Sequence, residues 1–135
     1  MERFFALSLA AVALAGGNQT SLRSLKCTIP APYASSLTYT IDQKGQTFDW
    51  DRDTNSWLPT PVKKEFDDWF FEHHSAIVDN VFRLESKNYR FEEPSEPYLK
   101  EFVEVDLKEL TFKWEISGYR ASEMQGTCEW VETKS

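Results

Sequence analysis

The sequence predicts an α+β or mainly β fold, in which antiparallel hairpins form a curved sheet or small open barrel with one packed amphipathic helix. Three observations support this prediction. Apolar and polar residues alternate in two hairpin-like stretches, the stretch between them has helical spacing, and two cysteines lie near opposite ends of the chain. With 10 Phe, 5 Trp and 5 Tyr in 135 residues, the chain has enough apolar area for one packed core.

The first 15 residues are typical of a secretory signal peptide. Arg3 precedes an apolar run over residues 4–14, and Ala13 and Ala15 have the small-x-small spacing of a cleavage site after Ala15. The run is about half as long as the roughly 20 residues of a membrane helix, so we expect no stable membrane span. A buried N-terminal helix is the alternative. We expect residues 16–135 to form a single small disulfide-closed domain of a secreted or periplasmic protein.

The first hairpin is predicted over residues 37–50. Leu37, Tyr39 and Ile41 alternate with polar residues, the segment QKGQ provides a turn, and Phe48 and Trp50 resume the alternation. This pattern directs Phe48 and Trp50 toward the core and the acidic residues between them toward solvent.

A second hairpin is predicted because VDLKELTFKW, residues 105–114, repeats the pattern of IDQKGQTFDW, residues 41–50. Phe112 and Trp114 alternate with Lys113, which stands where the first copy has Asp49. The outward position therefore accepts either sign of charge. A polar loop then leads to a last strand that begins near Thr127 and includes Cys128.

Between the hairpins the period changes from two to that of a helix. Thr60 is a suitable cap and Pro61 a suitable first helical residue. The apolar stripe of the predicted helix, which ends near His74, consists of Val62, Phe66, Trp69, Phe70 and His73. Residues 76–84 favour a strand, although a continued helix is also compatible with them, and residues 85–98 are expected to be an exposed connection.

Cys27 and Cys128 are predicted to form a disulfide, because an even pair in an exported chain indicates an oxidising compartment. A redox or metal-binding thiol pair is the alternative, but it normally has close spacing. The net charge of −7, with scattered Lys and Arg, argues against nucleic acid as a partner.

The segment TFDWDRDTNSW, residues 47–57, raises the question of a calcium site. Neither frame that starts at Asp49 or Asp51 has the Gly at position 6 and the Glu at position 12 of an EF-hand loop. A looser calcium site of Asp51, Asp53 and Asn55 is the alternative to a solvated turn. His73 and His74 have no further metal ligand at helical spacing, so we expect no cofactor.

Two functions from different classes remain. No nucleophile elbow, phosphate loop or dinucleotide fingerprint is present, which favours a non-enzymatic binding or envelope-associated module for a protein or small-molecule partner. Its candidate ligand-binding residues are aromatic: Trp50, Trp57, Trp114 and Trp130. The alternative is a small periplasmic or extracellular hydrolase that uses acidic residues, since paired carboxylates meet in space rather than in sequence.

Overall fold

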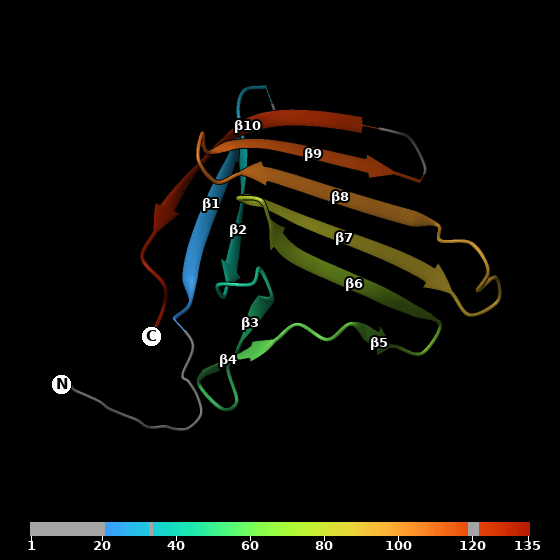
Figure 1. Ribbon diagram of the computed structural model, residues 1–135. Coiled ribbons are helices and arrows are strands. Elements are labelled where there is room, and N and C mark those ends of the chain that lie inside the picture. The colour runs from blue at the N-terminus through green and yellow to red at the C-terminus, as the bar shows by residue number, and fades with distance from the viewer. Residues whose placement is uncertain (1–20, 33, 119–121) are drawn as a thin grey trace.

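The computed structural model describes residues 21–32, 34–118 and 122–135, so the expected signal peptide lies outside the described residues. Ten strands follow one another along the chain (Figure 1): β1 (Arg23–Ile29), β2 (Ser35–Ile41), β3 (Thr47–Asp51), β4 (Ser56–Pro59), β5 (Lys63–Glu65), β6 (Trp69–Val78), β7 (Val81–Arg90), β8 (Leu99–Asp106), β9 (Thr111–Ser117) and β10 (Ser122–Val131).

All ten strands belong to one antiparallel sheet in the order β4-β3-β2-β1-β10-β9-β8-β7-β6-β5. Every ladder joins strands that are consecutive in the chain except the one between β1 and β10. Within the described ranges no ladder joins β4 to β5, so the sheet is not closed. The mainly β prediction is confirmed, whereas the packed helix is wrong, because the described residues contain no helix.

The sheet folds over itself at β10. The part of β10 up to Thr127 pairs with β9, and the part from Thr127 onward pairs with β1. In Figure 1, β1 and β2 therefore run at a steep angle to β6 through β9, and the two parts of the sheet face each other. We call the enclosed face the inner face and the opposite one the outer face.

The core lies between these two parts of the sheet. Its fully buried residues include Leu25 and Ile41 from one part and Phe82 and Val103 from the other. Tyr39 on β2 contacts Phe82 on β7, with 5.7 Å between their ring centroids. Alternate residues of β1, β7 and β8 supply much of this core, which is the pattern expected of strands with one buried face.

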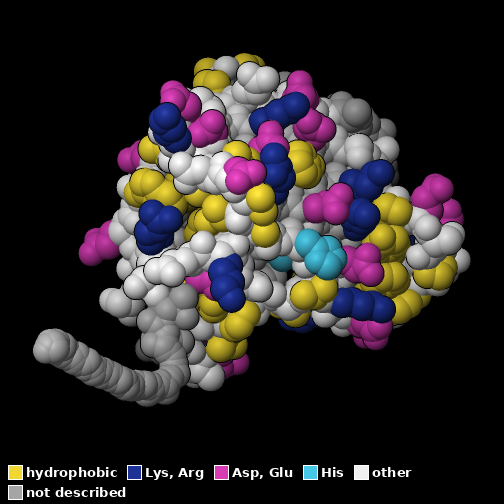
Figure 2. Space-filling model, viewed as in Figure 1, with side chains coloured by type: hydrophobic (Ala, Val, Ile, Leu, Met, Phe, Trp, Pro, Cys, Tyr) yellow, Lys and Arg dark blue, Asp and Glu magenta, His cyan; other side chains and the backbone are white. Residues whose placement is uncertain are grey.

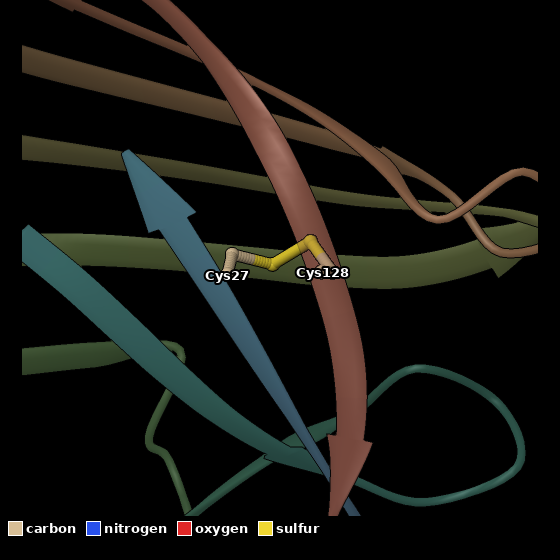
Figure 3. Close-up of a disulfide and its surroundings, with 2 residues drawn as sticks. All are labelled: Cys27 and Cys128. Carbon is tan, nitrogen blue, oxygen red and sulfur yellow. A yellow bond between two sulfur atoms is a disulfide. The ribbon is translucent and has the colours of Figure 1, made fainter. Parts of the chain in front are cut away.

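The predicted disulfide is confirmed. Cys27 of β1 lies directly opposite Cys128 of β10, their Cα atoms are 4.0 Å apart, and the bond lies within the core (Figure 3). Such a bond is typical of an oxidising compartment, and it is consistent with the expected secreted or periplasmic location.

A second connection between the two parts of the sheet is made by the turn between β2 and β3. The Ile77 amide of β6 donates a hydrogen bond to the Lys44 carbonyl oxygen, at 2.8 Å. Gly45, in this turn, has a φ of 88° and lies against the backbone of Ala76 and Ile77. The turn can approach β6 this closely because glycine has no side chain.

Replacing Gly45 with alanine is expected to lower the free energy of unfolding by about 2 kcal/mol or more. A β-carbon would overlap the backbone of Ala76 and Ile77, and the left-handed conformation alone costs about 1–2 kcal/mol for a non-glycine residue. Urea denaturation measures the change. Lys44→Ala, in the same turn, is the control, with an expected change within about 0.5 kcal/mol. Equal stabilities of the two variants would contradict this account.

The region predicted as a helix forms β5 and β6, which pair with each other. The apolar spacing resembled that of a helix because aromatic residues occupy both faces of β6, which removes the alternation of a strand. Phe70 lies on the outer face and stacks on Tyr89 of β7, with 4.8 Å between the ring centroids, whereas Phe71 lies on the inner face. Aromatic pairs across strands stabilise a sheet, and here they outweigh the capping signals of Thr60 and Pro61.

The segments after this region also differ from the prediction. Residues 76–84 are extended, but they belong to two strands joined by a turn at Asp79 and Asn80, whose φ angles are 52° and 66°. Two residues with positive φ form the tight turn that suits the twist of a hairpin. The strand β7 continues to Arg90, so only residues 91–98 of the expected connection lie outside strands.

The two similar hairpins form as predicted, but their strands face opposite ways. In the second hairpin, Val105 pairs with Phe112, so Phe112 and Trp114 lie on the inner face. In the first, Ile41 pairs with Thr47, so Phe48 and Trp50 alternate with the inner-face positions of Thr47 and Asp49. Phe48 borders hollows on both sides of β3, including the one on the inner side. A shift of one residue in register exchanges the two faces of a strand. Phe48 and Trp50 therefore do not point into the core as predicted, whereas Asp49 is exposed to solvent as predicted, although it lies on the inner side of the sheet.

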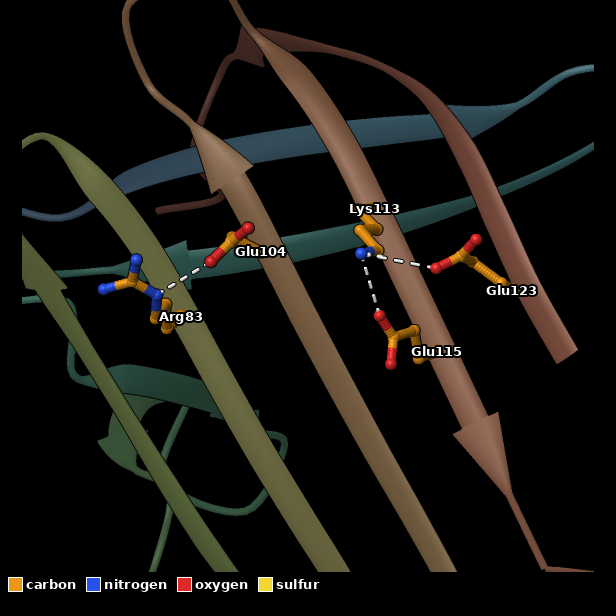
Figure 4. A network of polar contacts seen from close by, with 5 residues as sticks. All are labelled: Arg83, Glu104, Lys113, Glu115 and Glu123. Carbon is orange, nitrogen blue, oxygen red and sulfur yellow. Dashed lines mark hydrogen bonds and ion pairs between the residues drawn. The ribbon is translucent and has the colours of Figure 1, made fainter. Parts of the chain in front are cut away.

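The outer face of β7 through β10 carries charged side chains of both signs. Arg83 and Glu104 form an ion pair at 2.8 Å, and Lys113 bonds to Glu115 and Glu123 at 3.1 and 3.3 Å (Figure 4). Acidic and basic side chains also alternate over the face shown in Figure 2. In the part of the chain that the structure describes, no helix has the length and apolar character needed to cross a membrane.

Candidate functional site

A cavity of about 340 Å³ lies on the inner face, between β2–β3 on one side and β6–β8 on the other. Its lining combines three kinds of residue. The apolar and aromatic residues are Tyr39, Phe48, Phe71 and Leu84; the uncharged polar residues are Thr38, Thr40, Thr47, Thr60, Ser86 and Asn88; and the ionisable residues are Asp49, His73 and Glu101. The volume is at the lower end of the range for small-molecule sites.

Two of the larger hollows differ from this cavity in their many charged residues. One of about 480 Å³ lies among Glu85, Lys100, Glu115 and Glu123, and one of about 490 Å³ is lined by charged residues around Arg90 and Tyr98. Their charged side chains are largely exposed. The inner cavity is the better candidate, because apolar walls with a few converging polar groups are typical of ligand sites.

A row of polar residues crosses the inner face at the cavity. His73 of β6 lies opposite Ser86 of β7, and Ser86 lies opposite Glu101 of β8. Residues that are opposite one another on antiparallel strands share a face, and their Cβ atoms lie within about 5.5 Å of each other. Antiparallel pairing therefore gathers three hydrogen-bonding side chains from residues far apart in the sequence.

His73 connects this row to β3. Its Nε2 atom lies 2.8 Å from the hydroxyl oxygen of Thr47, a residue that is only 6% exposed. Burial lowers the pKa of His73, and the nearby Asp49 carboxylate partly opposes this effect. The imidazole is therefore neutral at pH 7, and one of its nitrogens can accept a hydrogen bond.

Glu101 lies at the opposite end of the row. The indole Nε1 of Trp114 donates a hydrogen bond to its Oε2 atom at 2.8 Å. Burial raises the pKa of Glu101, and the bond from Trp114 opposes that rise. The pKa of the Tyr39 phenol is also raised, first by burial and second by the charge of Glu101, so the phenol stays protonated. The Tyr39 phenol can donate a hydrogen bond to a ligand, and the Glu101 carboxyl group can accept one.

One buried polar atom of the lining lacks a hydrogen-bond partner among the described residues. The hydroxyl oxygen of Thr60 is buried and makes no hydrogen bond among the described residues. A buried hydroxyl without a partner is unfavourable by about 1–3 kcal/mol unless water or a ligand satisfies it. Thr60 lies between β4 and β5, where the sheet is interrupted.

Replacing His73 with asparagine is expected to reduce the loss of stability between about pH 7.5 and about pH 5.5. Because the folded pKa is lowered, the unfolded chain binds more protons as the pH falls through its own pKa of about 6.5, and stability is lost there. The raised pKa of Glu101 has the opposite effect on stability, because the folded state then binds the proton more tightly and is favoured as the pH falls.

Urea denaturation of both proteins at the two pH values measures this difference. His74→Asn is the matched control, since His74 is exposed on the same strand. A pH dependence that His73→Asn leaves unchanged would show that the imidazole is not the group responsible.

The four predicted tryptophans lie at three separate places. Trp50 and Trp57 pair on the outer face, with 5.2 Å between ring centroids in an edge-to-face arrangement. The C-terminal segment contacts them, because the Trp57 indole donates to the Lys134 carbonyl oxygen at 2.7 Å and the Lys134 ammonium lies 4.7 Å from the Trp50 ring. Both tryptophans stay partly exposed and line a separate hollow of about 400 Å³. Trp114 lies on the inner face beside Glu101.

Trp130, also on the inner face, lies opposite Leu25 of β1. The Arg23 guanidinium is 4.1 Å from the centre of its ring, a distance typical of a cation–π contact. The structure thus brings Trp50 and Trp57 together and leaves Trp114 and Trp130 apart from them.

The residues of the alternative calcium site lie at the turn between β3 and β4. The Asp51 carboxylate accepts hydrogen bonds from the Thr54 hydroxyl at 2.6 Å and the Thr54 amide at 3.2 Å. The bond from the hydroxyl is the main cause of the lowered pKa of Asp51. Asn55 adopts a φ of 56°, which suits a tight turn. Among the residues with described positions, no three of His, Cys, Asp and Glu form a metal-binding group.

Sequence reasoning missed the cavity residues Glu101 and Tyr39 and assigned His73 to a helix. A signal for Glu101 was present, since Leu99, Glu101, Val103 and Val105 alternate along one face of β8. A single carboxylate on an otherwise apolar face indicates either a buried partner or a site. Comparison of the chain with family models, curated proteins and solved structures finds no match.

Proposed function

We propose that the protein binds a small amphipathic molecule in the cavity between β2–β3 and β6–β8. The observation that supports this function most strongly is the mixed lining of the cavity, in which aromatic rings lie beside the polar row of His73, Ser86 and Glu101. Apolar walls contribute affinity, while a few hydrogen-bonding groups fix orientation and specificity.

The unpartnered hydroxyl of Thr60 is consistent with a ligand or water in the cavity. Binding there would place a secreted or periplasmic protein among the carriers or sensors of small molecules, in agreement with its disulfide.

Nuclear magnetic resonance titration with 2-phenylethanol and indole tests the proposal. The amide signals that shift are expected to belong to β2, β3 and β6–β8. Ser86→Phe, which fills the cavity from β7, is expected to abolish binding, and Asn88→Phe, on the same face, serves as a second filling variant. Thr127→Phe adds the same ring at an exposed outer-face position of β10 and is expected to leave binding unchanged.

Circular dichroism confirms whether each variant folds. Signal shifts that spread over the outer face, or that persist in both folded filling variants, would contradict binding in the cavity.

Hydrolysis is a second candidate, because two carboxylates, Asp49 and Glu101, line the same cavity. The raised pKa of Glu101 would suit a general acid, and Asp49 would then be the partner base or nucleophile. Release of 4-nitrophenol from 4-nitrophenyl glycosides tests this activity. Activity that Glu101→Gln and Asp49→Asn both remove would favour hydrolysis over simple binding.

A further inference from the structure

The described lining of the cavity has acidic residues but no Lys or Arg to pair with them. Asp49 and Glu101 contribute the carboxyl groups. His73, the remaining basic side chain of this described lining, is neutral at pH 7 because burial lowers its pKa. The electrostatic character of the cavity is therefore acidic, and a ligand that carries positive charge complements it.

The absence of basic residues follows from the alternation of the strands. Arg83 and Lys87 of β7 and Lys100 of β8 occupy positions that alternate with the cavity-lining ones, so they belong to the outer face. Arg83 is paired there with Glu104. A carboxylate ligand would meet Asp49 and Glu101 without a cation to offset the repulsion, which makes an anionic occupant unfavourable.

The position of Glu101 suits a bond to an ammonium group. One of its oxygens accepts the Trp114 indole hydrogen bond, which fixes the carboxyl group without adding charge. Ser86 lies opposite it and can accept a further hydrogen bond from the same ammonium group. Phe71 and Leu84 of the lining provide apolar surface for the rest of the ligand.

We propose that the ligand of this cavity is a small amine, protonated at neutral pH, with an aromatic or aliphatic body, and that Glu101 binds its ammonium group. This inference rests on the proposed function. The ammonium ion stabilises the ionised form of Glu101, so the fraction of Glu101 that is protonated at the working pH releases its proton to solvent when the amine binds. The charge balances, because the neutral acid and the ammonium ion become an ion pair and one free proton.

Isothermal titration calorimetry with three matched probes tests this proposal: 2-phenylethylamine, the neutral 2-phenylethanol and the anionic 3-phenylpropanoate. The amine is expected to bind at least about tenfold more tightly than the alcohol, and the carboxylate more weakly than either. Titration in buffers of different ionisation enthalpy is expected to show more proton release with the amine than with the alcohol, and the difference is expected to grow as the pH is lowered.

Glu101→Gln is expected to bring the affinity for the amine down to that for the alcohol and to remove proton release, while alcohol binding persists. Glu104→Gln, on the same strand but on the outer face, is the matched control and is expected to change neither. Persistent alcohol binding by Glu101→Gln also shows that this variant still folds.

The outcomes separate the two proposals. Binding of the alcohol in the cavity, with equal or weaker binding of the amine, overturns the amine inference and leaves the proposed function intact. An amine preference that Glu101→Gln does not change also overturns it. Failure of all three probes to bind contradicts both proposals.

Discussion

Replacing Phe82 with alanine is expected to lower the free energy of unfolding by about 3–5 kcal/mol. Phe82 is 0% exposed and is the largest fully buried side chain of the described core. It packs between the two parts of the sheet, where it contacts Tyr39. Its removal leaves a cavity that the rigid strands on either side cannot fill, and the cost of that cavity adds to the lost apolar burial.

Urea denaturation followed by tryptophan fluorescence measures this change. Val78→Ala is the control, since Val78 is 53% exposed at the end of the neighbouring β6, and its expected effect is below about 1 kcal/mol. Similar losses for the two variants would show that the two parts of the sheet do not pack together through Phe82.

Removing the disulfide by the double substitution Cys27→Ala and Cys128→Ala is expected to lower the free energy of unfolding by about 2–4 kcal/mol. The bond closes a long loop, since the two cysteines are 101 positions apart in the sequence. Chain entropy sets an upper figure of about 4.7 kcal/mol for a loop of this size. The fold itself is expected to persist, because the β1–β10 ladder also pairs neighbouring residues on either side of the cysteines.

Denaturation of the native protein with and without a reducing agent, alongside the double variant, measures this contribution. The reduced protein and the variant are expected to agree. Mass spectrometry that found two free thiols in the protein purified without reductant would contradict the disulfide, and unchanged stability on reduction would contradict its stabilising role.

Local patterns were sufficient to predict the strand-rich fold, two hairpins and the disulfide. Alternation in Leu37, Tyr39 and Ile41 and the turn at Gly45 depend on residues close in sequence, so they were visible without tertiary information. The strand β6 could not be recognised in this way, because Phe70 and Phe71 are both aromatic yet lie on opposite faces. A strand covered on both faces loses the alternation that identifies it.

The candidate site could not be predicted because it depends on register. His73, Ser86 and Glu101 become neighbours only when β6, β7 and β8 pair as they do. The face on which Asp49 lies depends on the register of its hairpin. Ile41 pairs with Thr47 there, whereas the corresponding Val105 of the second hairpin pairs with Phe112, one residue further along. Only pairing between strands determines which side chains reach the cavity.

The strand order also bears on how the chain folds. Of the nine ladders that join the described strands, eight form between consecutive strands and need only short loops to close. The ladder of β1 with β10 closes a loop of about a hundred residues. Contacts of such separation slow folding because the entropy of closing the loop is lost before the contact compensates for it. The disulfide joins these same two strands. Once oxidised, the chain therefore retains its slowest contact even when unfolded, and refolding is reduced to a succession of local hairpins.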